Sequence, residues 1–84
     1  MPTAHIRRKR AAIETVCDEE DKRLIISRCA LKDIDKRILT MILIERHDRG
    51  FVADTLGYDI STITRHLQQA LTVFEAVAKK LHKM

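Results

Sequence analysis

The chain reads Phe51-Val52-Ala53-Asp54-Thr55-Leu56-Gly57-Tyr58-Asp59-Ile60-Ser61-Thr62-Ile63-Thr64-Arg65-His66-Leu67 in its second half, and this stretch decides the fold. It predicts a short helix with Ala53 on its inner side and a second helix that Asp59 caps by accepting bonds from its free amides. Gly57 lies between them, and glycine readily takes the left-handed conformation that a tight corner requires. The stretch therefore predicts two helices joined by a sharp turn.

The second of these helices has two faces of opposite character. Its apolar stripe consists of Ile63, Leu67, Ala70 or Leu71, Phe74, Ala78 and Leu81, and its polar stripe of Ser61, Thr64, Arg65, Gln68 and Thr72. A helix-turn-helix needs both stripes, because its second helix is anchored on one side and enters the major groove of DNA with hydrogen-bonding groups on the other. A small residue such as Ala53 allows the two helices to cross closely. The spacing predicts a helix-turn-helix motif over about residues 50–71.

The same residues carry a resemblance to known proteins. Val52-Ala53, Leu56-Gly57-Tyr58, Ser61-Thr62-Ile63 and Arg65-His66-Leu67 resemble the helix-turn-helix of the LuxR/GerE-type regulators and of region four of bacterial sigma factors. The resemblance extends back through Leu43-Ile44-Glu45 and Ile38-Leu39 to Leu31, where those domains have a supporting helix. It covers about residues 31–71 and implies a DNA-binding regulator.

The remaining chain also predicts helices, because two Gly and one Pro are too few for a protein built from strands and hairpins. Residues 5–17 are either a weak amphipathic helix through Ile6, Ile13 and Val16 or a frayed arm. The acidic run Asp18–Asp21 is typical of a helix start. The next apolar positions are Leu24, Ile25, Cys29 and Leu31.

A central helix is expected after Asp33 or Asp35, either of which can cap or begin it. Its run 38–44 is apolar almost all round, which predicts a buried helix in preference to a buried strand. Gly50 is the expected stop, with Arg46, His47 and Arg49 in the last turn. The predicted fold is all-α, with four to five helices, the helix-turn-helix and a long C-terminal helix. Residues 1–17 form a basic N-terminal arm or weak helix, and residues 18–84 form the helix-turn-helix domain.

Composition narrows the function classes. The formal net charge is +4 and the calculated pI is about 9.4, which fits a nucleic-acid partner. Three aromatic residues are too few for a typical single-stranded nucleic-acid binder, which stacks bases on aromatic rings. Cys17 and Cys29 form no CxxC pair, and no nucleophile–base pair or metal-ligand spacing occurs. We expect no enzyme activity, no metal and no cofactor.

Without a signal core or an apolar run of about 18 residues, we expect a cytoplasmic, nucleoid-associated protein with no membrane contact.

The candidate DNA contacts fall into two groups. On the reading helix, Arg65 can bind a guanine edge and Gln68 an adenine edge. Ile60 either touches a thymine methyl or belongs to the core. Ser61 and Thr64 suit phosphates, and Tyr58 is expected to pack over the turn with its hydroxyl available to a phosphate. His66 is interpreted as a packed side chain. The basic residues Arg7, Arg8, Lys9, Arg10 and Arg49 can hold the backbone. For residues 7–10, a solvated tail or pairing with Asp18–Asp21 is the alternative.

The partners follow from these assignments. We expect a transcriptional repressor or autoregulator that binds double-stranded DNA through a recognition helix at about residues 60–71. A homodimer through Phe74, Val77 and Leu81 of a C-terminal dimerisation helix is expected, because lone helix-turn-helix units bind weakly. The alternative for this tail is that it folds back over the core of its own chain. The alternatives are an adaptor resembling sigma region four that binds RNA polymerase or another regulator, and a plasmid or phage DNA-maintenance protein that uses the same motif.

Overall fold

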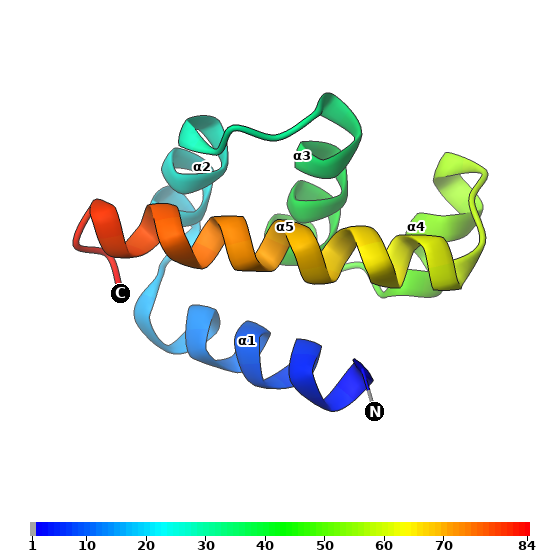
Figure 1. Ribbon diagram of the computed structural model, residues 1–84, viewed down its shortest axis with the longest axis horizontal. Coiled ribbons are helices and arrows are strands. Elements are labelled where there is room, and N and C mark those ends of the chain that lie inside the picture. The colour runs from blue at the N-terminus through cyan, green and yellow to red at the C-terminus, as the bar shows by residue number, and fades with distance from the viewer. Residues whose placement is uncertain (1) are drawn as a thin grey trace.

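The computed structural model is a set of helices packed around one long helix (Figure 1). It describes residues 2–84, with the backbone alone for residues 2–5. The elements are α1 (Pro2–Val16), α2 (Glu19–Arg28), α3 (Asp33–Leu39), the π-helical segment η1 (Thr40–Ile44), α4 (Arg49–Leu56) and α5 (Ile60–Lys80). Residues 2–84 contain no strand. The prediction of an all-α fold with a long C-terminal helix is confirmed.

Helix α5 forms the centre of the molecule. Its buried residues are Ile63, Leu67, Ala70, Leu71, Phe74 and Ala78, as the apolar stripe predicts, whereas Leu81 is half-buried. Helices α1, α2, α3 and α4 all contact α5. In Figure 1, α1 runs along one side of α5, α2 and α3 lie on the other side, and α4 lies near its first turns. The apolar face of α5 is therefore covered within one chain.

The N-terminal segment is a helix packed into this core. Ile6, Ile13 and Cys17 are buried, and Lys9 of α1 forms an ion pair with Glu75 of α5. Of the two alternatives that the sequence leaves open, the structure has the helix. The expectation for Val16 is wrong, because 51% of its surface is exposed and Cys17 takes the buried position.

The acidic run after α1 begins helix α2. The Asp18 side chain accepts a hydrogen bond from the Asp21 amide (2.8 Å), and the Asp21 side chain accepts one from the Asp18 amide (3.4 Å), which is a reciprocal capping box. Asp21 also forms an ion pair with Lys83 (3.1 Å). Within residues 6–84, no ion pair joins this run to Arg7–Arg10. Within α2, Ile25 and Ile26 are buried and Leu24 is exposed, contrary to its predicted core position.

The central helix begins at Asp33 and ends earlier than predicted. Residues 38–44 are helical, with Ile38 and Leu39 fully buried, and the strand alternative is wrong. The helix ends at Ile44 because Arg46 turns the chain in a left-handed conformation (φ 63°). Gly50 is therefore not the stop, and it lies in the first turn of α4. Asp48 caps that helix by accepting a hydrogen bond from the Phe51 amide (2.8 Å).

The two glycines allow a matched test of these conformations. Gly57 has φ 77° with nothing near an added Cβ, so Gly57→Ala should lower the free energy of unfolding by about 1–2 kcal/mol through strain alone. Gly50 is helical, and an added Cβ would meet only Asp48 Oδ1 at 3.4 Å. Gly50→Ala should therefore raise the free energy by about 0.4–1 kcal/mol. Urea denaturation measures both, and a stable Gly57→Ala variant would contradict the assigned turn.

Candidate nucleic-acid interface

The corner between α4 and α5 consists of Gly57, Tyr58 and Asp59. The amides of Gly57 and Tyr58 both donate to the Ala53 carbonyl (2.9 Å each), and Ala53 is buried. Asp59 occupies the N-cap position of α5, as predicted, but its side chain makes no capping hydrogen bond. Its main-chain carbonyl accepts from the Ile63 amide (3.1 Å) instead. The corner is therefore held by backbone bonds and by the left-handed Gly57.

The outward face of α5 carries three of the predicted DNA contacts. Ser61 and Arg65 are exposed and Gln68 is half-buried. They lie on the side of α5 opposite its buried stripe. Arg65 forms no ion pair within residues 6–84. Its guanidinium is therefore available to a partner.

Thr64 marks one edge of this face. Its hydroxyl accepts a hydrogen bond from the Arg49 guanidinium (2.8 Å) and donates one to the Ile60 carbonyl (2.9 Å). Arg49 is the first residue of α4, so this bond ties the two helices together. The Thr64 hydroxyl thus has two partners within the chain. Its contact with a phosphate stays a prediction.

His66 marks the other edge. Its Nδ1 lies 2.6 Å from Asp35 Oδ1, which joins α5 to α3. The ring is partly covered, with 33% of its side-chain surface exposed, in line with the packed role predicted for it. Asp35 as its partner has no signal in the sequence, because the two residues are far apart in the chain.

Apolar side chains remain exposed around the corner. Tyr58 is 46% exposed and Ile60 52% exposed, and Phe51 of α4 is also exposed. These exposed side chains lie on both helices and in the turn that joins them. Tyr58 and Ile60 are accordingly accessible to a partner of the α5 face.

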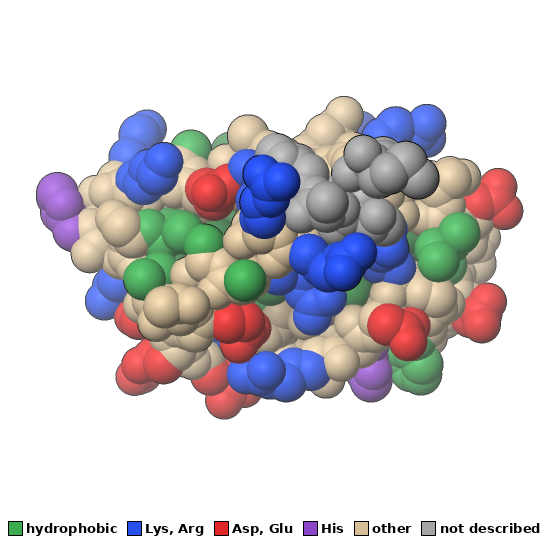
Figure 2. All heavy atoms as spheres, turned by 90° about the horizontal axis from the view of Figure 1, so that it is seen from below, with side chains coloured by type: hydrophobic (Ala, Val, Ile, Leu, Met, Phe, Trp, Pro, Cys, Tyr) green, Lys and Arg blue, Asp and Glu red, His purple; other side chains and the backbone are tan. Residues whose placement is uncertain are grey.

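The basic residues of α1 divide between different environments. Arg7 and Arg10 line a shallow concavity of about 380 Å³ together with Arg49, Asp48 and Ile6. Arg8 is exposed, and Lys9 is paired with Glu75. Figure 2 shows the face that carries α1, where Lys and Arg side chains gather near its middle. The fold thus brings Arg49 to the same concavity as Arg7 and Arg10 of α1.

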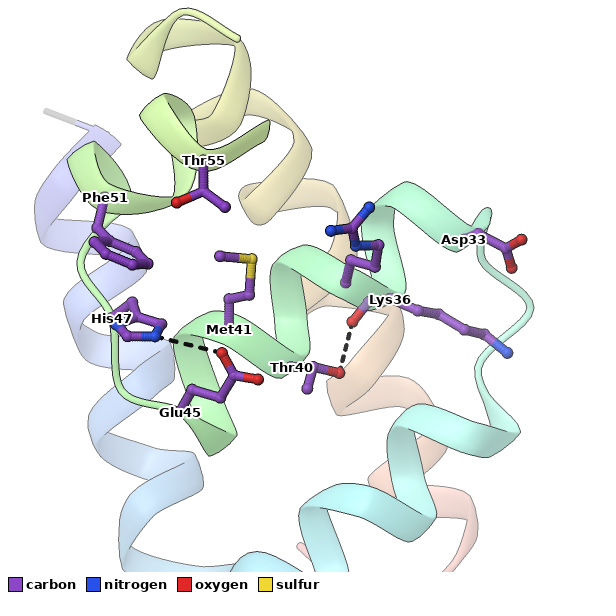
Figure 3. A pocket seen from close by; sticks show the side chains of 9 residues that line it. Asp33, Lys36, Thr40, Met41, Glu45, His47, Phe51 and Thr55 are labelled. Carbon is purple, nitrogen blue, oxygen red and sulfur yellow. Dashed lines mark hydrogen bonds and ion pairs between the residues drawn. The ribbon is translucent and has the colours of Figure 1, made fainter. Parts of the chain in front are cut away.

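A second, open groove of about 720 Å³ lies between α3–η1 and α4 (Figure 3). Its lining includes Arg37, Met41, His47 and Phe51. The rings of His47 and Phe51 stack with centroids 4.0 Å apart, and His47 Nε2 lies 3.4 Å from a Glu45 carboxylate oxygen. In Figure 3, the Met41 side chain points from η1 towards α4. No local sequence signal marks this groove.

The dimer contact predicted from the sequence needs one correction. Phe74 has no exposed surface, because it packs into the core of its own chain. Val77 and Leu81 are half-buried and pack against the same core. Phe74 is therefore wrong as a surface contact between two copies.

The remaining candidate chemistry is sparse. Cys17 and Cys29 are free thiols, and burial raises the pKa of both above the ordinary value. Residues 6–84 contain no group of His, Cys, Asp and Glu arranged to hold a metal ion. Among the described helices, none has the length and apolar character needed to cross a membrane.

No protein-family model matches the chain, and neither a curated protein nor a solved structure matches it.

Proposed function

We propose that the protein is a transcriptional regulator, a repressor or autoregulator, that binds double-stranded DNA sequence-specifically. Residues 60–71 of α5 would lie in the major groove, and the protein would act at the nucleoid. The observation that carries this proposal is the outward polar face of Ser61, Arg65 and Gln68, which directly follows a three-residue corner at the left-handed Gly57. A turn of three to four residues with a glycine is typical of the helix-turn-helix.

The chemistry of this face suits base recognition. Arg65 has the fork of donors that matches the guanine edge, and the Gln68 amide matches the adenine edge. The exposed Ile60 can contact a thymine methyl, while Ser61 and the Tyr58 hydroxyl can reach phosphates. From residue 61 to residue 68 the helix rises about 10 Å, which corresponds to about three base pairs. One chain therefore reads a short half-site.

A short half-site favours a homodimer on a pseudo-palindromic operator. Two recognition helices would then lie about 34–36 Å apart, one turn of the duplex. Of the three side chains predicted for such a contact, Val77 and Leu81 are still partly exposed. Selection of bound duplexes from a random pool tests the whole proposal. We expect two inverted half-sites about 10 base pairs apart, and the absence of any enriched motif would contradict sequence-specific binding.

Arg65→Ala tests the reading face directly. If Arg65 contacts a guanine, the ratio of affinities for the selected duplex and a scrambled one should fall by about 5- to 150-fold, the equivalent of 1–3 kcal/mol. The measurement is a fluorescence-anisotropy titration with both duplexes. Arg28→Ala removes the same charge from the end of α2 and is the matched control. An unchanged ratio in the Arg65 variant would show that the face is wrongly assigned.

The second candidate is an adaptor that docks on RNA polymerase or another regulator. The groove between α3–η1 and α4 favours it, because Arg37, Met41 and the exposed Phe51 belong to residue types enriched at protein interfaces. The two candidates depend on different surfaces, α5 for DNA and the groove for a protein. Lack of salt-sensitive duplex binding in the selection would favour the adaptor. A plasmid or phage DNA-maintenance role would use the same α5 face as the regulator.

A further inference from the structure

Three arginines from two distant segments of the chain share one concavity. Arg7 and Arg10 come from α1 and Arg49 from the start of α4, with Ile6 and Asp48 completing the lining. Asp48 is the only carboxylate among these residues, and its Oδ1 already accepts the Phe51 amide (2.8 Å). Within residues 6–84, no ion pair joins any of the three arginines to an acidic group. The concavity therefore carries an excess of positive charge.

We propose that this concavity binds one backbone phosphate of the DNA duplex, at the edge of the groove that α5 occupies. The inference rests on the proposed function and assigns the backbone contacts expected of Arg7, Arg10 and Arg49 to a single shared phosphate. Guanidinium groups bind phosphate oxygens with paired, charge-assisted hydrogen bonds, so several converging arginines suit a phosphate.

The position of the concavity fits this partner. Arg49 lines it and also donates to the Thr64 hydroxyl (2.8 Å). Thr64 directly precedes Arg65 and lies at the edge of the reading face. A phosphate in the concavity would therefore belong to the strand that borders the bases under Arg65, because phosphate contacts set the register of a recognition helix.

The packing of α1 gives the site a fixed shape. Ile6 and Ile13 are buried in the core, and Lys9 is paired with Glu75 of α5. These contacts hold α1 in place along α5. A site preformed in this way avoids the entropy cost of ordering a tail on binding. Arg8 is exposed and does not line the concavity.

The salt dependence of duplex binding tests whether the three arginines share a phosphate. Each phosphate contact contributes about 0.9 to the slope of log affinity against log salt concentration. For binding to a duplex of random sequence, the triple variant Arg7→Ala/Arg10→Ala/Arg49→Ala should lose about 0.9 of this slope. A loss near 2.7 would mean three separate phosphates, and an unchanged slope would mean none; either result overturns the inference. Arg28→Ala should leave the slope unchanged.

Two further variants act without removing the arginine charges. Asp48→Asn removes the carboxylate from the lining of the concavity but keeps a good N-cap for α4. Because the negative charge near the phosphate is lost, duplex affinity should rise by about two- to five-fold. Unchanged or weaker binding would overturn the inference.

The triple Arg→Lys variant should keep the wild-type slope and bind more weakly, because lysine lacks the planar fork. If the wild-type protein shows no salt-sensitive duplex binding, the proposed function falls as well. If the wild-type protein binds and the triple Arg→Ala variant has the same salt slope, this inference alone is overturned.

Discussion

Phe74→Ala is expected to lower the free energy of unfolding by about 3–5 kcal/mol, the usual cost of emptying a buried phenylalanine site. Phe74 has no exposed surface and lies in the buried stripe of α5, where the other helices converge. A domain of this kind has a total stability of about 5–15 kcal/mol. The substitution should therefore remove a large part of it, measured by urea denaturation monitored by circular dichroism.

The same variant separates a core residue from a dimer contact. If Phe74 stabilised the protein through a second copy, the loss on substitution would depend on protein concentration. Because the side chain packs within its own chain, the loss should be the same at every concentration. Val77→Ala, one turn further along α5 and half-buried, is the control and should cost about 1 kcal/mol. A concentration-dependent loss for Phe74→Ala would contradict the single-chain core.

The apolar spacing of α5 predicts which of its residues are buried but not what covers them. Residues 63, 67, 74 and 78 follow directly from helical periodicity, and all are buried. Between Ala70 and Leu71 the periodicity leaves the choice open, and the structure buries both. From the sequence alone, Phe74 nevertheless looks free for a dimer contact, because it stays open whether residues 5–17 form an arm or a weak helix. In α1 the signal is faint, because Ile6 and Ile13 lie two turns apart among charged residues. Only the tertiary packing of α1, α2, α3 and α4 on α5 shows that the same chain covers Phe74.

The turns show a similar limit. Gly57 is correctly predicted as the left-handed residue of the corner, because glycine is favoured there. After the central helix, Arg46 takes that conformation although Gly50 is nearby. The neighbouring Asp48 gives the reason, since its carboxylate caps α4 and thereby places Gly50 inside a helix.

Contacts between distant residues have no local sequence signal. The bond from Arg49 to Thr64 joins the two helices of the corner, and the pair of His66 and Asp35 joins α5 to α3. The concavity of Arg7, Arg10 and Arg49 likewise depends on where α1 packs. The sequence identifies the arginines as candidate phosphate ligands, and the fold brings three of them to one concavity.

Among residues 6–84, Lys22 is the one charged side chain that is buried, and breaking its ion pair should have the second large effect on stability. Its side chain is 3% exposed, and its ammonium donates to Glu14 Oε1 (2.6 Å) and to the Leu43 carbonyl (3.2 Å). Arg46 also pairs with Glu14 (3.0 Å). Glu14→Gln should lower the free energy of unfolding by about 3 kcal/mol, because it leaves a buried ammonium without its counter-charge. Lys22→Met removes that charge altogether and should cost less, about 1–2 kcal/mol.

The pH dependence identifies the electrostatic part of this loss. The hydrogen bond from Lys22 holds the pKa of Glu14 below its ordinary value of 4.5, with the charges of Lys22 and Arg46 acting in the same direction and partial burial opposing them. A lowered pKa in the folded state means that the stabilisation is fully present well above pH 4.5 and is lost as the pH falls through the folded-state pKa.

The stability difference between the wild-type protein and Glu14→Gln should therefore be constant near neutral pH and shrink in acid. Asp21, whose pKa is lowered chiefly by its hydrogen bond from Lys83, is present in both proteins, so its contribution cancels in the difference. Urea denaturation of both proteins between about pH 7 and pH 3 measures the effect. A difference that persists unchanged in acid would mean that Glu14 acts through packing, because a protonated carboxyl and an amide have the same charge.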